Sequence, residues 1–224
     1  SYFKGTREPA GGTLDWTFED FDDASWPKGP SGFGYGDNDD ATVFNDMRQG
    51  GGNPGYLTAY VRRKFEIADV AAVSGLSLVV DYDDAFVAYL NGEEVARSAG
   101  MAGAGQVGES IPFDLEIGNA INHEASRGNN NPNPPETYPI GAWKSLLHAG
   151  SNVLAIQRFN STRDSGDFSL IPELVSFGAM ASGGGGWGSA LFVSGDTARL
   201  QGTADAPVAA SLKVNGVLAT ITSR

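Results

Sequence analysis

Acidic side chains are concentrated in a short run that follows a glycine-rich segment near the start of the chain. Asp37, Asn38, Asp39 and Asp40 come directly after the stretch 32–36, in which every second residue is glycine. Carboxylate and amide oxygens are the hard ligands that calcium prefers. The spacing is similar to the beginning of an EF-hand loop, but the glycine and the twelfth-position glutamate of that loop are missing. Asp37, Asp39 and Asp40 therefore predict either a structural calcium site or a solvated acidic turn whose side chains cap their own backbone.

Other carboxylates come in adjacent pairs, at 19–20, 22–23 and 83–84. Asp83-Asp84 is interpreted either as a pair of ligands or as structural support for the hairpin that follows it. Glycosidases also use two carboxylates, but across a cleft whose geometry a sequence does not show. The two histidines, His123 and His148, lie outside any H-E-x-x-H frame, and no G-x-S-x-G segment marks a nucleophilic serine. We therefore predict no catalytic residues and no enzyme.

Four aromatic residues in loop-like regions are candidates for ligand binding. Trp26 and Tyr35 lie in a segment rich in glycine and proline, and Tyr138 and Trp143 flank the end of a long segment rich in asparagine and proline. The apolar face of a sugar ring stacks on aromatic side chains, with polar groups around it. These four residues predict a carbohydrate-binding surface; the alternative is that Trp26 and Trp143 close the ends of a hydrophobic core.

The elements that would position these residues are short strands. Runs rich in Val, Phe, Tyr and Thr predict strands at about 13–19, 57–67, 76–81, 85–90, 93–97, 111–116, 151–159 and 168–178. Asn91-Gly92 supplies two residues that tolerate positive φ, as a type I′ turn between 85–90 and 93–97 requires. The segment 119–139 is predicted to be a long surface loop, and 142–147 a single helical turn.

Charge and composition exclude several classes of partner. The 224 residues contain 15 Lys and Arg against 27 Asp and Glu, a formal net charge of −12, so nucleic acid is an unfavourable partner. There is no run of about 18 apolar residues, so no membrane insertion is expected. The absence of cysteine excludes a disulfide scaffold and a zinc–thiolate site. Residues 1–5 do not read as a signal peptide, although a mature protein or an excised fragment would have lost one.

A glycine-rich segment divides the chain. Residues 182–189 are predicted to be a linker between a β-sandwich domain at 1–181 and a partial immunoglobulin-like segment at 190–224. The last segment contains short strand-like runs and a second Asn-Gly pair at 215–216. About 35 residues bury too little apolar surface to fold alone. We therefore expect 190–224 to pair with other domains of a larger protein or with a neighbouring chain.

The phrase DYDDAFVAYLNGEEVA at 81–96 resembles the hairpin of galactose-binding-like β-sandwich domains. The segments 21–43, 122–125 and 149–174 are similar to a module found repeatedly in large secreted bacterial proteins, and the similarity extends over about 1–178. Domains of this kind serve as carbohydrate-binding modules and as accessory domains of glycoside hydrolases. The resemblance implies a jelly roll, a secreted or cell-surface location and a structural calcium ion near one end of the sandwich.

The sequence thus predicts an all-β fold, a two-sheet antiparallel jelly-roll sandwich followed by a short, incomplete immunoglobulin-like segment. The expected function is a non-catalytic, calcium-stabilised extracellular module that binds carbohydrate or attaches a larger protein to a polysaccharide. The alternative is a structural or adhesive module whose tail strands pair with a neighbouring domain or chain.

Overall fold

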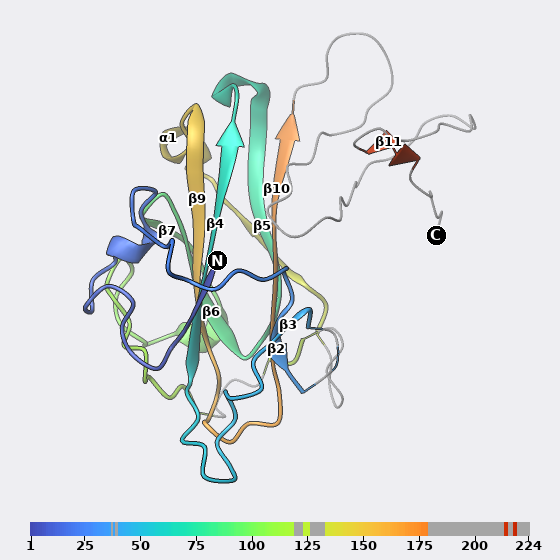
Figure 1. Cartoon of the computed structure of the whole chain (residues 1–224). Coiled ribbons are helices and arrows are strands. Elements are labelled where there is room, and N and C mark those ends of the chain that lie inside the picture. Colours follow the sequence, from blue (N-terminus) through green and yellow to red (C-terminus); the bar gives the residue numbers. More distant parts are fainter. Residues whose placement is uncertain are drawn as a thin grey trace.

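The computed structural model describes residues 1–36, 38, 40–118, 123–125 and 133–178, together with the backbone of 213–214 and 217–218. Two five-stranded sheets pack face to face (Figure 1). The first sheet has the order β1 (Tyr2–Lys4), β4 (Thr58–Ile67), β9 (Gly150–Phe159), β6 (Ala85–Leu90) and β7 (Glu93–Arg97). The second has the order β3 (Thr42–Val43), β2 (Phe33–Tyr35), β10 (Phe168–Gly178), β5 (Val73–Asp83) and β8 (Glu136–Pro139).

The prediction of an all-β, two-sheet sandwich is confirmed. All strand pairs of the two sheets are antiparallel except β2 with β3, which is parallel. Helical structure in the described residues is limited to α1 (Trp143–Leu146) and the 3₁₀ turns η1 (Asp15–Thr17), η2 (Val70–Ala72) and η3 (Ala99–Met101). None of these is long and apolar enough to cross a membrane.

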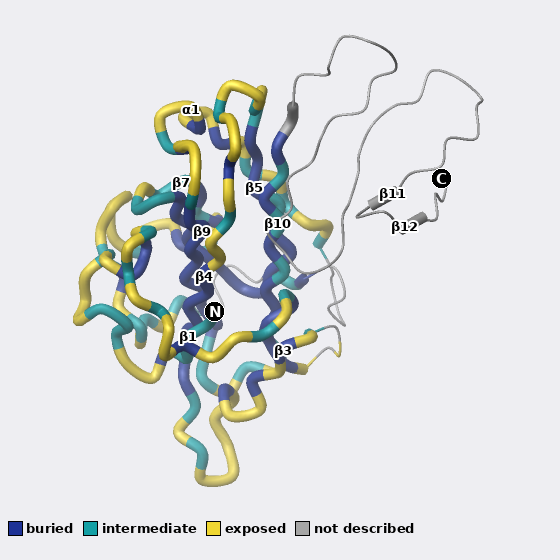
Figure 2. The backbone as a smooth tube through the Cα atoms, turned by 45° about the horizontal axis from the view of Figure 1, so that its top comes forward, coloured by how far each residue is buried: buried dark blue, intermediate teal, exposed yellow. Residues whose placement is uncertain are grey.

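Two predicted strands are wrong for the same physical reason. Segment 13–19 forms η1, and 111–116 forms no strand. Their apolar side chains, among them Trp16 and Ile111, instead lie in loops that cover the outer face of the first sheet. There they pack on Tyr60, Tyr89 and other side chains of that face, and this second core is buried as deeply as the one between the sheets (Figure 2). The first sheet is therefore buried on both faces, which explains its continuous apolar runs.

A buried arginine holds this covering loop in place. Arg62 on β4 is 1% exposed. Its guanidinium donates hydrogen bonds to the backbone oxygens of Trp16, Phe18 and Phe21, and pairs with Asp23 at 3.1 Å. A guanidinium has five N–H donors in a fixed plane, so one side chain can satisfy several loop carbonyls at once. Arg62 thus fixes the loop 16–23 on the outer face of the first sheet.

The sequence did not indicate the four shortest strands of the two sheets, and one of them, β8, lies within the segment 119–139 that was predicted to be a long surface loop. β1, β2, β3 and β8 contain two to four residues each, too few for an alternating pattern to be recognised. β1 pairs only with residues 59–61 of the ten-residue β4, and β2 only with residues 168–170 of the eleven-residue β10. Beyond these pairings, no described strand covers this edge of β4 or of β10 (Figure 1). On this side the space between the sheets is left open.

Little of the C-terminal segment is described. β11 (Lys213–Val214) and β12 (Val217–Leu218) pair antiparallel across the two residues 215–216, in agreement with the predicted Asn-Gly hairpin. The predicted linker at 182–189 and the remainder of 190–224 lie outside the described residues. The division into domains at 181 and 190 stays a prediction.

The central hairpin has the turn that its sequence predicts. β6 and β7 are joined by Asn91 and Gly92, which have φ values of 50° and 93°. Positive φ at both positions is the signature of a type I′ turn. The Asn91 amide also donates to the Leu146 oxygen and accepts from the Val153 N–H, which ties the turn to α1 and β9.

We expect Gly92→Val to destabilise the protein by on the order of 1 kcal/mol or more, because a β-branched residue resists positive φ. A Cβ at this position would also lie 2.2 Å from the Phe18 ring. Gly141→Val is the matched control, because no atom lies within 4 Å of a Cβ at Gly141. Urea unfolding of both variants measures the difference. Equal stability of Gly92→Val and the parent protein would contradict the turn assignment.

Candidate functional site: an acidic corner and an inter-sheet groove

Two connections cross between the sheets at the same end of the sandwich. β5 passes into β6 through the cis peptide bond between Asp83 and Asp84, and β9 passes into β10 through residues 160–167. Asp83 is 3% exposed and Asp84 is 2% exposed. The Asp84 carboxylate accepts a hydrogen bond of 2.6 Å from the backbone N–H of Ser161, so it joins the two connections. We call this end of the molecule the acidic corner, formed by residues 83–84, 158–161 and 167 with Asp40 and Glu124.

Among the described residues of the acidic corner, one buried cation offsets part of the negative charge. Arg158 on β9 is fully buried, and its Cζ lies 3.2 Å from the centre of the Phe168 ring. Its guanidinium nitrogens have no hydrogen-bond acceptor among the described residues. Burial lowers the pKa of Arg158, while the charges of Asp83, Asp84 and Asp40 oppose that shift. Arg158 therefore acts through its charge and its stacking on Phe168.

Three carboxylates of the acidic corner converge on one point. One oxygen each of Asp83, Glu124 and Asp167 lies within 4.8 Å of the other two. Oxygens that share one calcium ion at about 2.3–2.6 Å are separated by no more than about 5 Å. The three residues thus have the ligand type and the spacing of a divalent cation site.

The electrostatics of this cluster favour a cation. Burial raises the pKa of Asp83; the Arg158 charge opposes this shift, and the Asp84 charge adds to it. Burial also raises the pKa of Asp167, again with a contribution from Asp84. Both shifts mean that negative charge is costly here, since neighbouring carboxylates repel one another away from water. A bound divalent cation would remove this cost.

The calcium ligands predicted from the sequence are placed only in part. Asp37 and Asp39 lie outside the described residues. Asp40 belongs to the acidic corner, where it interacts with Arg158 and accepts a 3.5 Å hydrogen bond from the Ser169 hydroxyl. A Cβ on Gly34 would lie 1.8 Å from the Phe168 oxygen and 2.5 Å from the Asp40 carboxylate. Gly34 is therefore needed so that Asp40 and β10 can pack against β2.

His123 forms a separate polar contact at the edge of the second sheet. Its Nδ1 lies 2.8 Å from the Tyr82 backbone oxygen, and its ring stacks on the Tyr82 ring with 3.8 Å between centroids. Its Nε2 lies 3.2 Å from a carboxylate oxygen of Glu136. Glu136 also accepts hydrogen bonds from the Tyr82 and Tyr138 hydroxyls. Burial acts to raise the pKa of Glu136, but these partners outweigh it and lower the pKa.

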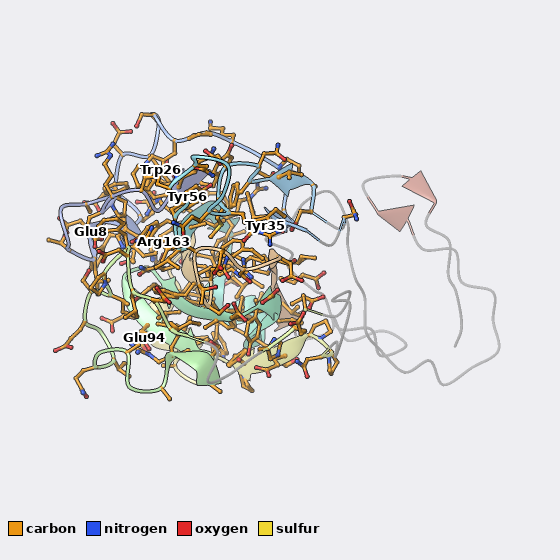
Figure 3. The ribbon with its side chains drawn as sticks, turned by 90° about the horizontal axis from the view of Figure 1, so that it is seen from below. Glu8, Trp26, Tyr35, Tyr56, Glu94 and Arg163 are labelled. Carbon is orange, nitrogen blue, oxygen red and sulfur yellow. The ribbon has the colours of Figure 1, made fainter. Side chains whose placement is uncertain are left out.

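The four predicted sugar-binding aromatics are not brought together. Trp26 packs between Phe3 and Phe21 in the core outside the first sheet. Tyr35 lies in the core between the sheets, well apart from Trp26 (Figure 3). Trp143 is 7% exposed and belongs to the same core as Tyr35. Tyr138 is half-buried and packs edge-on against Phe86. These rings support the core, as the alternative interpretation held for Trp26 and Trp143, and their role as ligands stays a prediction.

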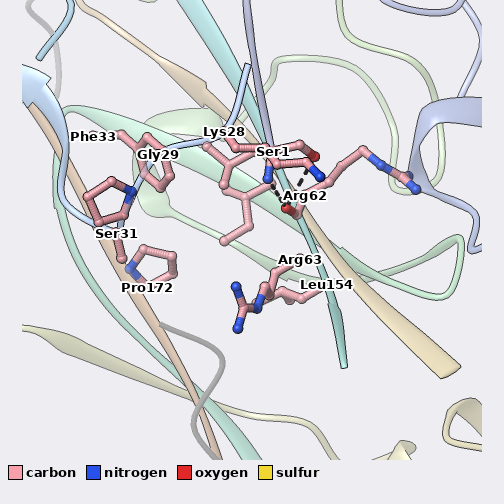
Figure 4. A pocket seen from close by; sticks show the side chains of 12 residues that line it. Ser1, Lys28, Gly29, Ser31, Phe33, Arg62, Arg63, Leu154 and Pro172 are labelled. Atoms are coloured by element: carbon pink, nitrogen blue, oxygen red, sulfur yellow. Dashed lines mark hydrogen bonds between the residues drawn. The ribbon is translucent and has the colours of Figure 1, made fainter. Parts of the chain in front are cut away.

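A groove of about 400 Å³ opens where β1 and β2 leave the edges of the sheets uncovered (Figure 4). Its floor is apolar and comes from both sheets, with Val61, Leu154 and Ile156 on one side and Phe33 and Pro172 on the other. Its rim is polar and is formed by Lys28, Ser31 and Arg63. The Ser31 hydroxyl oxygen is buried and has no hydrogen-bond partner among the described residues. This volume and this mixture of apolar and polar lining are typical of small-molecule sites.

Sequence reasoning missed most of this site. Glu124 and Asp167 are isolated in the sequence and meet Asp83 only because the chain crosses between the sheets. Three basic residues, Arg62-Arg63-Lys64, follow one another in the predicted strand 57–67. Strand alternation places them on alternate faces, but it does not show that Arg62 is buried or that Arg63 lines a groove. Lys28 and Ser31 lie in a loop with no distinguishing motif.

No protein-family model matches the chain, and no curated protein matches it. Among solved structures, the chain is similar to a Streptomyces avermitilis α-L-rhamnosidase complexed with L-rhamnose, with a TM-score of 0.35, 21% identity and coverage of 70% of this chain. It is also similar to a native α-L-rhamnosidase from Aspergillus terreus, with a TM-score of 0.37, 14% identity and coverage of 63%. The chain spans 12% and 14% of the length of these two enzymes.

We expect Asp84→Ala to destabilise the protein by about 2 kcal/mol, because it leaves the buried Ser161 N–H without an acceptor and Arg158 with one counter-charge fewer. Asp114→Ala removes an exposed carboxylate elsewhere and should change stability little. Chemical unfolding of the two variants provides the comparison. If Asp84→Ala proves no less stable than Asp114→Ala, the hydrogen bond between the two connections contributes nothing.

Proposed function

We propose that the chain is a non-catalytic module that binds carbohydrate in the inter-sheet groove and is stabilised by calcium at the acidic corner. The carbohydrate assignment is supported by the apolar floor and the polar rim of the groove. Its apolar floor matches the C–H faces of sugar rings, and its rim offers hydrogen-bonding groups to hydroxyls.

Calcium is supported by the convergence of Asp83, Glu124 and Asp167. The ligands are all carboxylate oxygens, which suit a hard cation, and there is no cysteine in the chain. Calcium held there would connect the strand end at Asp83 to the connection that carries Asp167. It would thus add a further cross-link between the two crossing segments.

A non-catalytic role agrees with how the acidic corner uses its carboxylates. The Asp84 carboxylate accepts a hydrogen bond from the Ser161 backbone N–H, and Asp83 is 3% exposed and lies near the fully buried Arg158. A general acid or nucleophile must reach the substrate. These two side chains are instead directed to each other and to the protein, so we assign them a structural role.

A second candidate function rests on the uncovered strand edges. Beyond residue 62 on β4 and beyond residue 170 on β10, the N–H and C=O groups of the outer edge face no described strand. Such edges accept an added strand from another segment or chain. This favours the assembly role, in which a neighbouring domain completes one of the sheets.

The calcium assignment predicts a rise in melting temperature in millimolar calcium and its reversal by EDTA. A ligand that binds only the folded state, present at a concentration of 100 times its Kd, stabilises the folded state by about 2.7 kcal/mol. Glu124→Gln should lose most of the calcium-dependent rise in melting temperature, whereas Glu116→Gln, at an exposed position, should keep this rise. Thermal melts of the three proteins with calcium and with EDTA are the measurement. A parent protein whose melting temperature responds to neither addition would exclude the site.

The carbohydrate assignment predicts that filling the groove abolishes binding. Ser31→Trp places a large side chain at the rim, and Ser145→Trp makes the same change at an exposed position on α1. Affinity electrophoresis against a panel of soluble polysaccharides should show retardation of the parent and of Ser145→Trp, but not of Ser31→Trp. Retardation of all three proteins alike would place the binding surface elsewhere, and retardation of none would refute the function.

A further inference from the structure

The groove carries a charge opposite to that of the rest of the protein. The chain has a formal net charge of −12. Yet the described residues that line the groove include Lys28, Arg62 and Arg63 and no acidic residue. Arg62 turns its guanidinium to the loop on the other face of the sheet. The Ser1 ammonium group also lines the groove, but it donates a hydrogen bond of 2.9 Å to the Arg62 backbone oxygen. Lys28 and Arg63 are therefore the side chains that supply positive charge to a ligand in the groove.

These two cations are available to a ligand. Both side chains are exposed, and neither forms an ion pair or a hydrogen bond with a described residue. Figure 4 shows the Arg63 guanidinium reaching over the groove from β4 towards the side of Pro172, with Lys28 on the opposite side of the cavity. A ligand on the apolar floor would therefore lie between two positive charges.

The negative charge of the whole molecule does not override this local arrangement. At physiological ionic strength the Debye length is about 8 Å, so exposed charges farther away than this are largely screened. A ligand inside the groove interacts mainly with Lys28 and Arg63. The planar guanidinium of Arg63 is suited to bidentate hydrogen bonding with a carboxylate.

From these features we propose that the groove selects an acidic saccharide, one whose sugar units carry a carboxylate, by pairing that carboxylate with Arg63 and Lys28. The inference rests on the proposed carbohydrate function and specifies its ligand class. The sugar ring would lie on the apolar floor between these two side chains. Two cations are too few for a densely charged polyanion, so a single carboxylate per bound unit fits the groove best.

The test uses an oligogalacturonate and its fully methyl-esterified form, in which each carboxylate is replaced by an uncharged methyl ester, with dextran sulfate as a third arm. Isothermal titration calorimetry on the full chain should show binding of the oligogalacturonate, and binding at least about tenfold weaker of the ester. The affinity for the oligogalacturonate should also fall as salt is raised, since exposed charges are screened.

Three variants that each remove one positive charge identify the residues responsible. Arg63→Gln and Lys28→Gln should weaken oligogalacturonate binding, Arg63→Gln by about tenfold or more. Lys64→Gln is the matched control, because Lys64 is exposed next to Arg63 but lies outside the groove, where it pairs with Glu19 at 3.4 Å. It should bind as the parent does. Unchanged melting temperatures would show that all three variants are folded.

Each other outcome contradicts a definite part of the proposal. Equal binding of the acid and the ester would overturn the selection of a carboxylate and leave the carbohydrate function standing. Preference for dextran sulfate, or an equal loss in Lys64→Gln and Arg63→Gln, would show non-specific attraction of anions and overturn the inference. Binding of none of the probes, together with no polysaccharide in the electrophoresis panel, would overturn the carbohydrate function itself.

Discussion

The hydrogen bond from the Ser161 N–H to the Asp84 carboxylate joins the two connections that cross between the sheets. Because these connections cross from one sheet to the other, they place polar backbone groups at the end of a hydrophobic core. An N–H group without a hydrogen-bond partner there would lower the stability of the protein. A carboxylate solves this problem, but it brings a negative charge into the protein. Arg158, fully buried and stacked on Phe168, offsets part of that charge. Burial, together with the charge of Asp84, raises the pKa values of Asp83 and Asp167, and these two carboxyl groups lie close to that of Glu124.

The groove results from the different lengths of neighbouring strands. β1 and β2 are three residues long, whereas their partners β4 and β10 have ten and eleven residues. The long strands therefore extend beyond the short ones, and the space between the sheets opens there as the groove. The same edges could receive a strand from a neighbour, so the binding and assembly roles compete for one side of the molecule.

The longer elements could be predicted from the sequence because their patterns are local. The hairpin at 85–97 and the strand at 168–178 agree with the observed strands residue by residue, since turn chemistry and alternation specify them. Trp16 and Ile111 were misjudged because their burial depends on a sheet that lies elsewhere in the sequence. The same limit applies to the sites. Asp40 was predicted from its residue type to bind calcium, which stays a prediction. Its proximity to Arg158 and the lining of the groove by Lys28, Ser31 and Arg63 are long-range consequences of the fold.

The central claim is that ligand and cation act at two separate places, the groove and the acidic corner. Amide chemical shifts of the ¹⁵N-labelled protein test it most directly, in separate titrations with oligogalacturonate and with calcium. The account predicts that the saccharide shifts the amides of residues 28–29, 31–33 and 61–63, and that calcium shifts those of 83–84, 124, 161 and 167. Saccharide-induced shifts confined to other surfaces, or calcium-induced shifts that leave the acidic corner unchanged, would contradict it.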